Sequence, residues 1–427
     1  MSGRTAPAPA PTASGMTPAL AAAPPAVVTG LGVIAPNGTG TEEYWRAMLR
    51  GESGIGRITR FDPSPYAATL AGEVKGFEPK KHLPNRLLPQ TDPMTRLALV
   101  AAEEALADAD LDPRQLPEYA AGVVTAASGG GFEFGQRELE ALWSRGGDHV
   151  SAYQSFAWFY PVNSGQISIR HGMRGPGGAL VAEQAGGLDA VAKARRHVRD
   201  GTSMMVTGGV DGALCPWGWL CQTRSGGLSP HADPRRAYLP FSTHASGYVP
   251  GEGGAMLVLE DAHSAAERGA VHVYGGIAGY AATFDPRPGS GRPPGLRRAI
   301  QLALADAALS ADAIDVVFAD AMGLPEADAV EAKALADEFG PRGVPVTAPK
   351  TMTGRLLAGG ASLDLATALL SLRDQVIPPT VNVHDRATPH ALDLVTGGPR
   401  AAELNCALVL ARGHGGFNSA MVVRRTA

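Results

Sequence analysis

Short apolar runs alternate with amphipathic segments along most of the chain. Runs of strand type lie at 26–34, 121–125, 204–208, 255–259, 314–319, 406–411 and 419–423, and helical periodicity covers 41–49, 92–107, 188–199, 296–308, 326–339 and 363–373. Apolar strands that alternate with helices are typical of parallel-type sheets covered by helices on both faces. The pattern therefore predicts an α/β protein. The alternation of strands and helices begins a second time near Val271, which indicates two similar halves.

One junction between a strand and a helix carries candidate chemistry. An apolar run ends at Val181, a turn of small residues follows, and helical periodicity begins at Leu188. Such an elbow lifts one side chain toward a helix N-terminus, where backbone N–H groups stabilise a thiolate or an oxyanion. The residue there is Gln184, whose amide neither ionises near neutral pH nor attacks a thioester. The elbow thus has the frame of a covalent acyl-transfer site without its reactive atom.

Composition narrows the function classes. A hydrophobic content of 44%, a charged content of 18% and a net charge of -4 describe a globular protein with no affinity for nucleic acid. No apolar stretch is long enough to span a membrane. The three cysteines form no pairing framework and predict free thiols in the cytoplasm. Residues 1–25 are rich in Ala and Pro and predict a disordered tail rather than a signal peptide.

Several longer strings resemble a known family. They are the strings at 90–93, 155–160, 165–170, 216–219 and 247–254. On these strings the chain resembles the β-ketoacyl synthases, and among them the chain length factors, which are the ketosynthase β subunits of bacterial type II aromatic polyketide synthases. The resemblance implies the α/β thiolase fold, with two similar βαβ-rich halves, 26–270 and 271–427, in a five-layered αβαβα architecture.

The resemblance also implies which chemical groups are replaced. Active members carry Cys at the position of Gln184, and His in two loops at the positions of Asp320 and Arg355, whereas Lys350 is kept. A gating Phe corresponds to His414. An anion at Asp320 would repel a malonyl carboxylate, and a guanidinium cannot act as a base. We therefore expect no condensation chemistry from this chain.

Each replacement also has a purely structural interpretation. Gln184 would fill the core and bond to nearby backbone groups, Asp320 and Arg355 would form a buried pair, and His414 would be a hydrogen-bonded loop residue. Two enzymatic alternatives stay open. In one, the Gln184 carbonyl mimics an acyl-cysteine and favours decarboxylation of malonyl-acyl carrier protein. In the other, Glu183 is a nucleophile, although a carboxylate beside a helix N-terminus is more simply a dipole-stabilised anion.

A further cluster concerns substrate length. Phe132, Gly135 and Leu139 recur at helical spacing, which by itself is typical of a core-facing stripe. The resemblance instead places this helix against a ketosynthase partner, where these side chains and Phe156 close the far end of the partner's acyl tunnel.

The sequence therefore predicts the non-condensing subunit of a heterodimer. The resemblance implies a catalytic ketosynthase partner that elongates a malonyl-derived chain on an acyl carrier protein, with no metal or organic cofactor. The interface should be large, apolar and pseudo-two-fold symmetric.

Overall fold

The structure is a computed structural model that describes residues 26–383 and 390–426. The predicted tail, residues 1–25, lies outside the described residues. Within the described part of the chain, no helix combines the length and the hydropathy that a membrane span requires.

Two sets of five strands repeat one spatial order. The first set runs β6 (Gly177–Leu180), β5 (Ala121–Ala126), β7 (Met204–Asp211), β8 (Gly253–Asp261) and β1 (Ala26–Ala35); the second runs β11 (Pro345–Thr347), β10 (Val316–Phe318), β15 (Cys406–Gly413), β16 (Phe417–Arg424) and β9 (Gly275–Phe284). The sets meet where Val27 and Val28 of β1 pair with β9, so they form one continuous sheet. This repeat confirms the predicted duplication.

Strand direction differs from the prediction. β5 runs parallel to β6 and β7, and β10 runs parallel to β11 and β15. The ladders of β8 with β7 and β1, and of β16 with β15 and β9, are antiparallel. The expectation of parallel-type sheets was therefore wrong for half of each set. Helices cover both faces of these strands, so every strand is apolar whichever way it runs, and hydrophobic runs do not encode direction.

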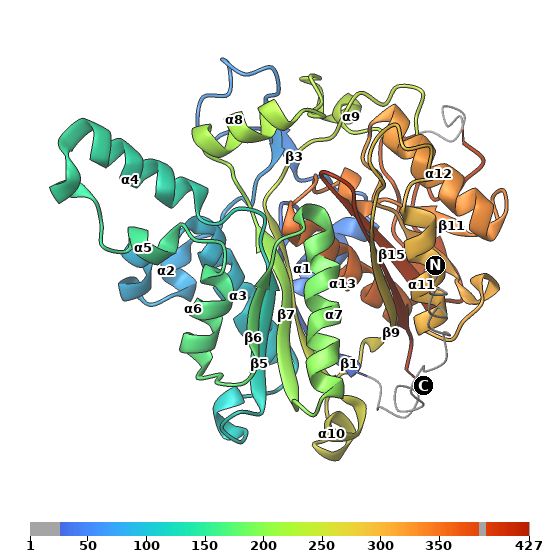
Figure 1. Ribbon diagram of the computed structural model, residues 1–427, viewed down its shortest axis with the longest axis horizontal. Coiled ribbons are helices and arrows are strands. Elements are labelled where there is room, and N and C mark those ends of the chain that lie inside the picture. The colour runs from blue at the N-terminus through green and yellow to red at the C-terminus, as the bar shows by residue number, and fades with distance from the viewer. Residues whose placement is uncertain (1–25, 384–389, 427) are drawn as a thin grey trace, which may run out of the picture.

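Helices form three layers around the two sets of strands (Figure 1). α7 (Gly186–Arg199) and α13 (Ala358–Asp374) pack between them, α3 (Pro93–Asp108) and α6 (Val162–His171) cover the outer face of the first, and α11 (Leu296–Asp306) and α12 (Pro325–Phe339) cover the outer face of the second. α13 is buried from Ala358 to Leu372 because it is apolar on all sides. The predicted five layers are present.

Shorter elements complete the fold. They are β2 (Gly38–Thr39), α1 (Thr41–Leu49), β3 (Ile55–Arg57), β4 (Leu70–Gly72), α2 (Pro79–His82), α4 (Phe132–Arg145), α5 (Gln154–Ala157), α8 (Pro216–Ser225), α9 (Pro234–Ala237), α10 (Ala262–Glu267), β12 (Val376–Ile377), β13 (Asp393–Leu394) and β14 (Arg400–Ala401). β13 lies at the edge of the sheet beside β11, opposite the edge formed by β6. α4 extends away from the body of the molecule on the β6 side (Figure 1).

Candidate functional site

The Gln184 side chain is buried and hydrogen-bonded to the main chain of Leu357. It lies in a single 3-10 turn, Glu183–Ala185, that leads into α7. Its amide nitrogen faces the carbonyl oxygen of Leu357 at 3.0 Å, and its amide oxygen faces the N–H of Leu357 at 3.1 Å. A Cβ added at Gly360 would collide with this carboxamide. Gln184 thus fills a space between the elbow and the start of α13, as the structural interpretation predicts.

Asp320 and Arg355 meet as a two-pronged ion pair. Nη2 of Arg355 donates to Oδ1 of Asp320 at 3.0 Å, and Nη1 donates to Oδ2 at 3.1 Å and to the Asp320 carbonyl at 2.8 Å. Both side chains are 2% exposed. Burial alone would raise the pKa of Asp320, but the charges of Arg355 and Lys350 outweigh it and hold that pKa below its ordinary value. The predicted buried pair is present, and it stays charged.

Two acidic partners of this network were missed from the sequence. Lys350 lies 2.7 Å from Oδ2 of Asp364, which projects from the apolar helix α13. Glu331 on α12 accepts hydrogen bonds from the N–H groups of Asp320 (2.7 Å) and Ala321 (2.8 Å). Burial raises the pKa of Glu331 to about 7. For Asp364 the available signal was a lone carboxylate in an otherwise apolar helical segment, whereas α12 carries several acidic residues and so gave no signal for Glu331.

His414 and Glu183 connect the elbow to the turn between β15 and β16. The backbone N–H of His414 donates to Oε2 of Glu183 at 2.8 Å, while the His414 side chain is exposed. A Cβ added at Gly413 would come within 2.5 Å of the Ala182 carbonyl oxygen, so this turn rests directly on the elbow. The Glu183 carboxylate therefore holds a backbone group, which fits an anion with a structural role.

The helix singled out for substrate length, α4, divides into two faces. Its buried residues are Phe134, Gly135, Glu138 and Ala141, whereas Leu139 is 38% exposed. The core-stripe interpretation is therefore wrong for Leu139. Phe132 packs on Trp217 with ring centroids 5.0 Å apart, and Phe156 packs on Tyr153 at 5.8 Å.

The sequence did not predict that Trp217, in the segment 216–219, is a neighbour of α4. A Cβ added at Gly135 would lie 3.2 Å from the Trp217 ring and 3.6 Å from Cβ of Trp158. The Trp217 ring therefore covers Gly135 and leaves little room for a side chain there.

Large apolar side chains are exposed together around α4. We call this set the aromatic face; it comprises Leu139, Leu142, Trp143, Tyr153, Trp158, Phe159, Tyr160, Trp217 and Leu220. Trp143 is 84% exposed. Val181, immediately after the edge strand β6, is also exposed. Exposed apolar side chains gathered on neighbouring elements such as α4, α5 and α8 are typical of an interaction site.

Comparison with known proteins identifies the family. The family model of the β-ketoacyl synthase N-terminal domain matches residues 23–265, and that of the C-terminal domain matches residues 274–384. The chain belongs to the β-ketoacyl synthase family. Within it, the chain is 62% identical over 407 residues to the tetracenomycin polyketide synthase ketoacyl synthase beta subunit of Streptomyces glaucescens, covering 95% of this chain and 100% of the relative. Identity to a 3-oxoacyl-[acyl-carrier-protein] synthase 2 of Synechocystis is 32% over 409 residues, covering 93% of this chain and 97% of the relative.

Solved ketosynthase structures share the fold. The ishigamide ketosynthase/chain length factor superposes with a TM-score of 0.85 at 28% identity, covering 95% of this chain and 100% of that one. A type II polyketide acyl-carrier protein in complex with its ketosynthase gives a TM-score of 0.83 at 26% identity, covering 94% and 100%. The predicted similarity to ketosynthase β subunits on the thiolase fold is thus confirmed.

Proposed function

We propose that this β-ketoacyl synthase family member is the ketosynthase β subunit, or chain length factor, of a bacterial type II polyketide synthase. The observation that carries the proposal is the Gln184 side chain, hydrogen-bonded to Leu357 where the family has its nucleophile. The high identity to a protein named as such a beta subunit supports it. In this role the chain forms no acyl-enzyme, because a primary amide does not attack a thioester.

The neighbouring groups argue against independent catalysis. A decarboxylating site needs a donor that can approach a malonyl carboxylate, but Arg355 is engaged with Asp320 through both terminal nitrogens. The amide oxygen of Gln184 accepts from the Leu357 N–H, so it does not offer a free carbonyl dipole to a substrate. These contacts favour a structural subunit over a decarboxylase.

The partner we propose is a catalytic ketosynthase. β6 pairs with β5 on one side only among the described residues, so its other side is available for an added strand. The aromatic face surrounds α4, which extends from the same side of the molecule (Figure 1), and it would be covered in the complex together with the exposed Trp143. Acyl carrier protein would deliver its bound acyl chain to the ketosynthase subunit of this complex.

The acyl tunnel of the partner would end against α4. Phe132, Gly135, Leu139 and Phe156 would form its wall. The exposed flank of Leu139 supports this arrangement, because it leaves α4 with an apolar side chain directed away from its own core, and Gly135 lies beneath the Trp217 ring that borders this flank.

The proposal also covers the cellular location of the complex and the boundary between the two halves of this chain. We place the complex in the cytoplasm, in keeping with the free thiols of Cys215, Cys221 and Cys406. We place the boundary between the halves at residues 270–271, between the ranges that the two family models match.

Co-expression with the cognate ketosynthase tests the proposal. We expect a one-to-one complex by gel filtration, and no acyl adduct on peptide 182–188 after incubation with malonyl-acyl carrier protein. A stable adduct on this chain, or carbon dioxide release by the chain without its partner, would show it to be an enzyme in its own right.

A further inference from the structure

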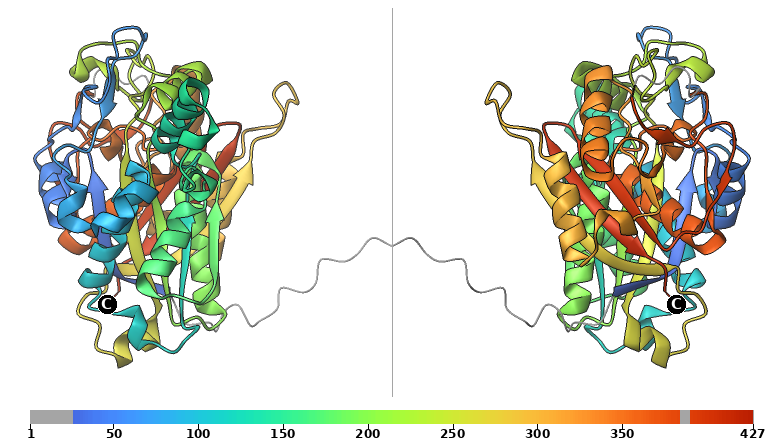
Figure 2. Two further views of the ribbon diagram at one scale, coloured as in Figure 1. Left: turned by 90° about the vertical axis from the view of Figure 1, so that its left-hand side faces the viewer. Right: turned by 90° about the vertical axis from the view of Figure 1, so that its right-hand side faces the viewer.

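The segment after β9 forms an arm that projects from the molecule. Residues 286–294 are exposed, apart from partly covered Pro286, and both side views show the loop standing away from the body (Figure 2). Four of its nine residues are prolines, which fix the backbone φ angle and reduce the freedom that binding would remove.

The base of the arm is held on both sides. Oδ1 of Asp285 accepts from the N–H of Gly295 at 2.6 Å and from Nδ2 of Asn418 at 2.8 Å. The Asp285 N–H donates to the Gly416 carbonyl at 2.8 Å, which ties the arm to the turn that carries His414. The base of the arm is therefore fixed in place next to the turn that packs on the elbow at Gln184.

Positive charge is concentrated here in a chain that is acidic overall. Residues 286–305 contain four arginines and no acidic residue, while the net charge of the chain is -4. Arg287 and Arg292 lie on the exposed arm, and Arg298 lies on the exposed side of α11. No hydrogen bond or ion pair joins these three guanidinium groups to the residues that the structure describes. They are free to meet an acidic surface.

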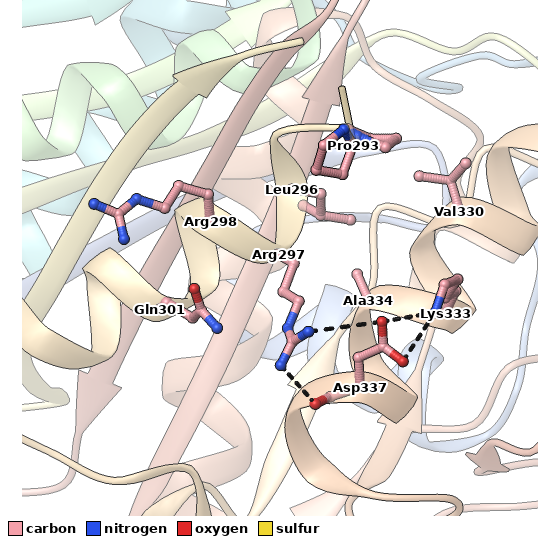
Figure 3. A pocket seen from close by; sticks show the side chains of 10 residues that line it. Pro293, Leu296, Arg297, Arg298, Gln301, Val330, Lys333, Ala334 and Asp337 are labelled. Atoms are coloured by element: carbon pink, nitrogen blue, oxygen red, sulfur yellow. Dashed lines mark hydrogen bonds and ion pairs between the residues drawn. The ribbon is translucent and has the colours of Figure 1, made fainter. Parts of the chain in front are cut away.

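Apolar surface lies on both flanks of the arm. Phe284, which is 60% exposed, packs edge-to-face on Phe417 with ring centroids 5.0 Å apart. On the other flank, a pocket of about 380 Å³ opens between α11 and α12, with Pro293, Leu296 and Val330 among its lining residues (Figure 3). Arg297 at its rim is already paired with Asp337 and Glu338. Apolar anchors beside unpaired arginines are typical of protein interfaces.

We propose that the arm, the Phe284–Phe417 pair and the adjoining pocket form a docking surface on this subunit for an acidic acyl carrier protein. The inference rests on the proposed function, which supplies that partner. A carrier docked here cannot unload onto Gln184. It would instead be held on the complex, which raises its local concentration above that of free carrier protein.

A photo-crosslink at the tip of the arm tests this surface. The isolated complex, or this chain alone if no complex forms, carries a benzophenone amino acid in place of Ser290 and is irradiated with the carrier protein. We expect a covalent adduct between the arm and the carrier. R287E/R292E should lower its yield about tenfold, because attraction becomes repulsion at two positions. K75E/K80E, which reverses two exposed lysines elsewhere, should leave the yield unchanged.

The outcomes separate the two proposals. Gel filtration of the complex reports on subunit pairing and does not depend on the arm. An adduct that is lost in R287E/R292E and weakened by added salt supports the docking surface. No adduct, an adduct insensitive to R287E/R292E, or an adduct with a second copy of the complex or with nucleic acid overturns it.

Discussion

The carboxamide of Gln184 and the main chain of Leu357 form a closed pair of hydrogen bonds. Leu357 has a φ of 51°, which is unfavourable for a branched side chain, and it immediately precedes α13. Gln184 therefore stabilises a strained turn at the start of α13. In our proposal, this contact replaces the nucleophile of active relatives.

Gln184→Cys should lower stability without restoring condensation. The thiol does not reach both backbone groups of Leu357, and leaving them unpaired in a buried site costs about 1–3 kcal/mol. Asp320 and Arg355 would still occupy the histidine positions. Urea denaturation and malonyl condensation assays of the variant chain without its partner measure the two effects. Gln166→Ala, at a half-buried glutamine without such bonds, serves as the control, and condensation by the isolated Gln184→Cys chain would contradict our assignment.

Arg355→Met should be among the most damaging single changes. It leaves the Asp320 carboxylate buried without its partner, at a cost of about 3–5 kcal/mol in the free energy of unfolding. The double variant Arg355→Met/Asp320→Leu should recover much of this loss, because no uncompensated charge remains. Arg400→Met, which removes a half-exposed pair with Asp393, should cost at most about 1 kcal/mol. Equal losses in Arg355→Met and Arg400→Met would show that the buried pair is unimportant.

Glu331 should make the stability fall as the pH rises toward neutrality. Burial raises the pKa of its carboxyl from 4.5 to about 7, so the folded chain binds this proton more tightly than the unfolded chain. The contribution is complete below pH 4.5 and is lost as the pH rises through about 7. Glu331→Gln should flatten the dependence of the unfolding free energy on pH by about 1–3 kcal/mol over this window. Glu326→Gln, on the exposed start of the same helix, should leave the dependence unchanged.

Leu139→Phe should shorten the polyketide made by the reconstituted synthase. Leu139 is 38% exposed, so a larger ring extends outward without displacing the core of this chain. The product of the unaltered complex should be longer than an octaketide, because Gly135 and Leu139 are small. Gly135→Thr should act in the same direction but destabilise by about 1–3 kcal/mol, since its added atoms press on Trp217. Mass spectrometry of the products decides, with Leu309→Phe in the second half as control. An unchanged product length in an intact, active complex would refute the tunnel assignment.

Trp143→Ala should weaken the complex while leaving this chain folded. The indole is 84% exposed in the isolated chain, so its loss removes little internal packing. A buried interface tryptophan typically contributes more than about 2 kcal/mol to binding. Gel filtration at decreasing concentration should show earlier dissociation, with an unchanged unfolding temperature of the chain alone. Tyr119→Ala, an exposed aromatic away from the aromatic face, should not affect association.

Local chemistry was predictable from the sequence, whereas long-range geometry was not. Gln184, Asp320 and Arg355 were singled out because the resemblance aligns them with the reactive side chains of active members, and the buried pair that it suggested for Asp320 and Arg355 is present. The antiparallel direction of β8 and β16 was not predictable from the sequence, because a buried strand is apolar whichever way it runs. α13 was predicted to begin at Leu363 but begins at Ala358, because Gly359 and Gly360 are typical of a turn unless a close packing partner requires them. The roles of Asp364 and Glu331 were not predictable, because their partners Lys350 and Asp320 lie on other elements of the fold.

The two ends of the sheet are unequal, and this limits how large an assembly can become. β6 offers four residues for pairing, but β13 at the opposite end has two, and the side chain of Asp393 there is held by Arg400. Among the residues that the structure describes, a subunit that joins at β6 finds no edge of similar length on the far side from which the sheet could be extended. Strand addition at β6 therefore favours a pair over a longer assembly.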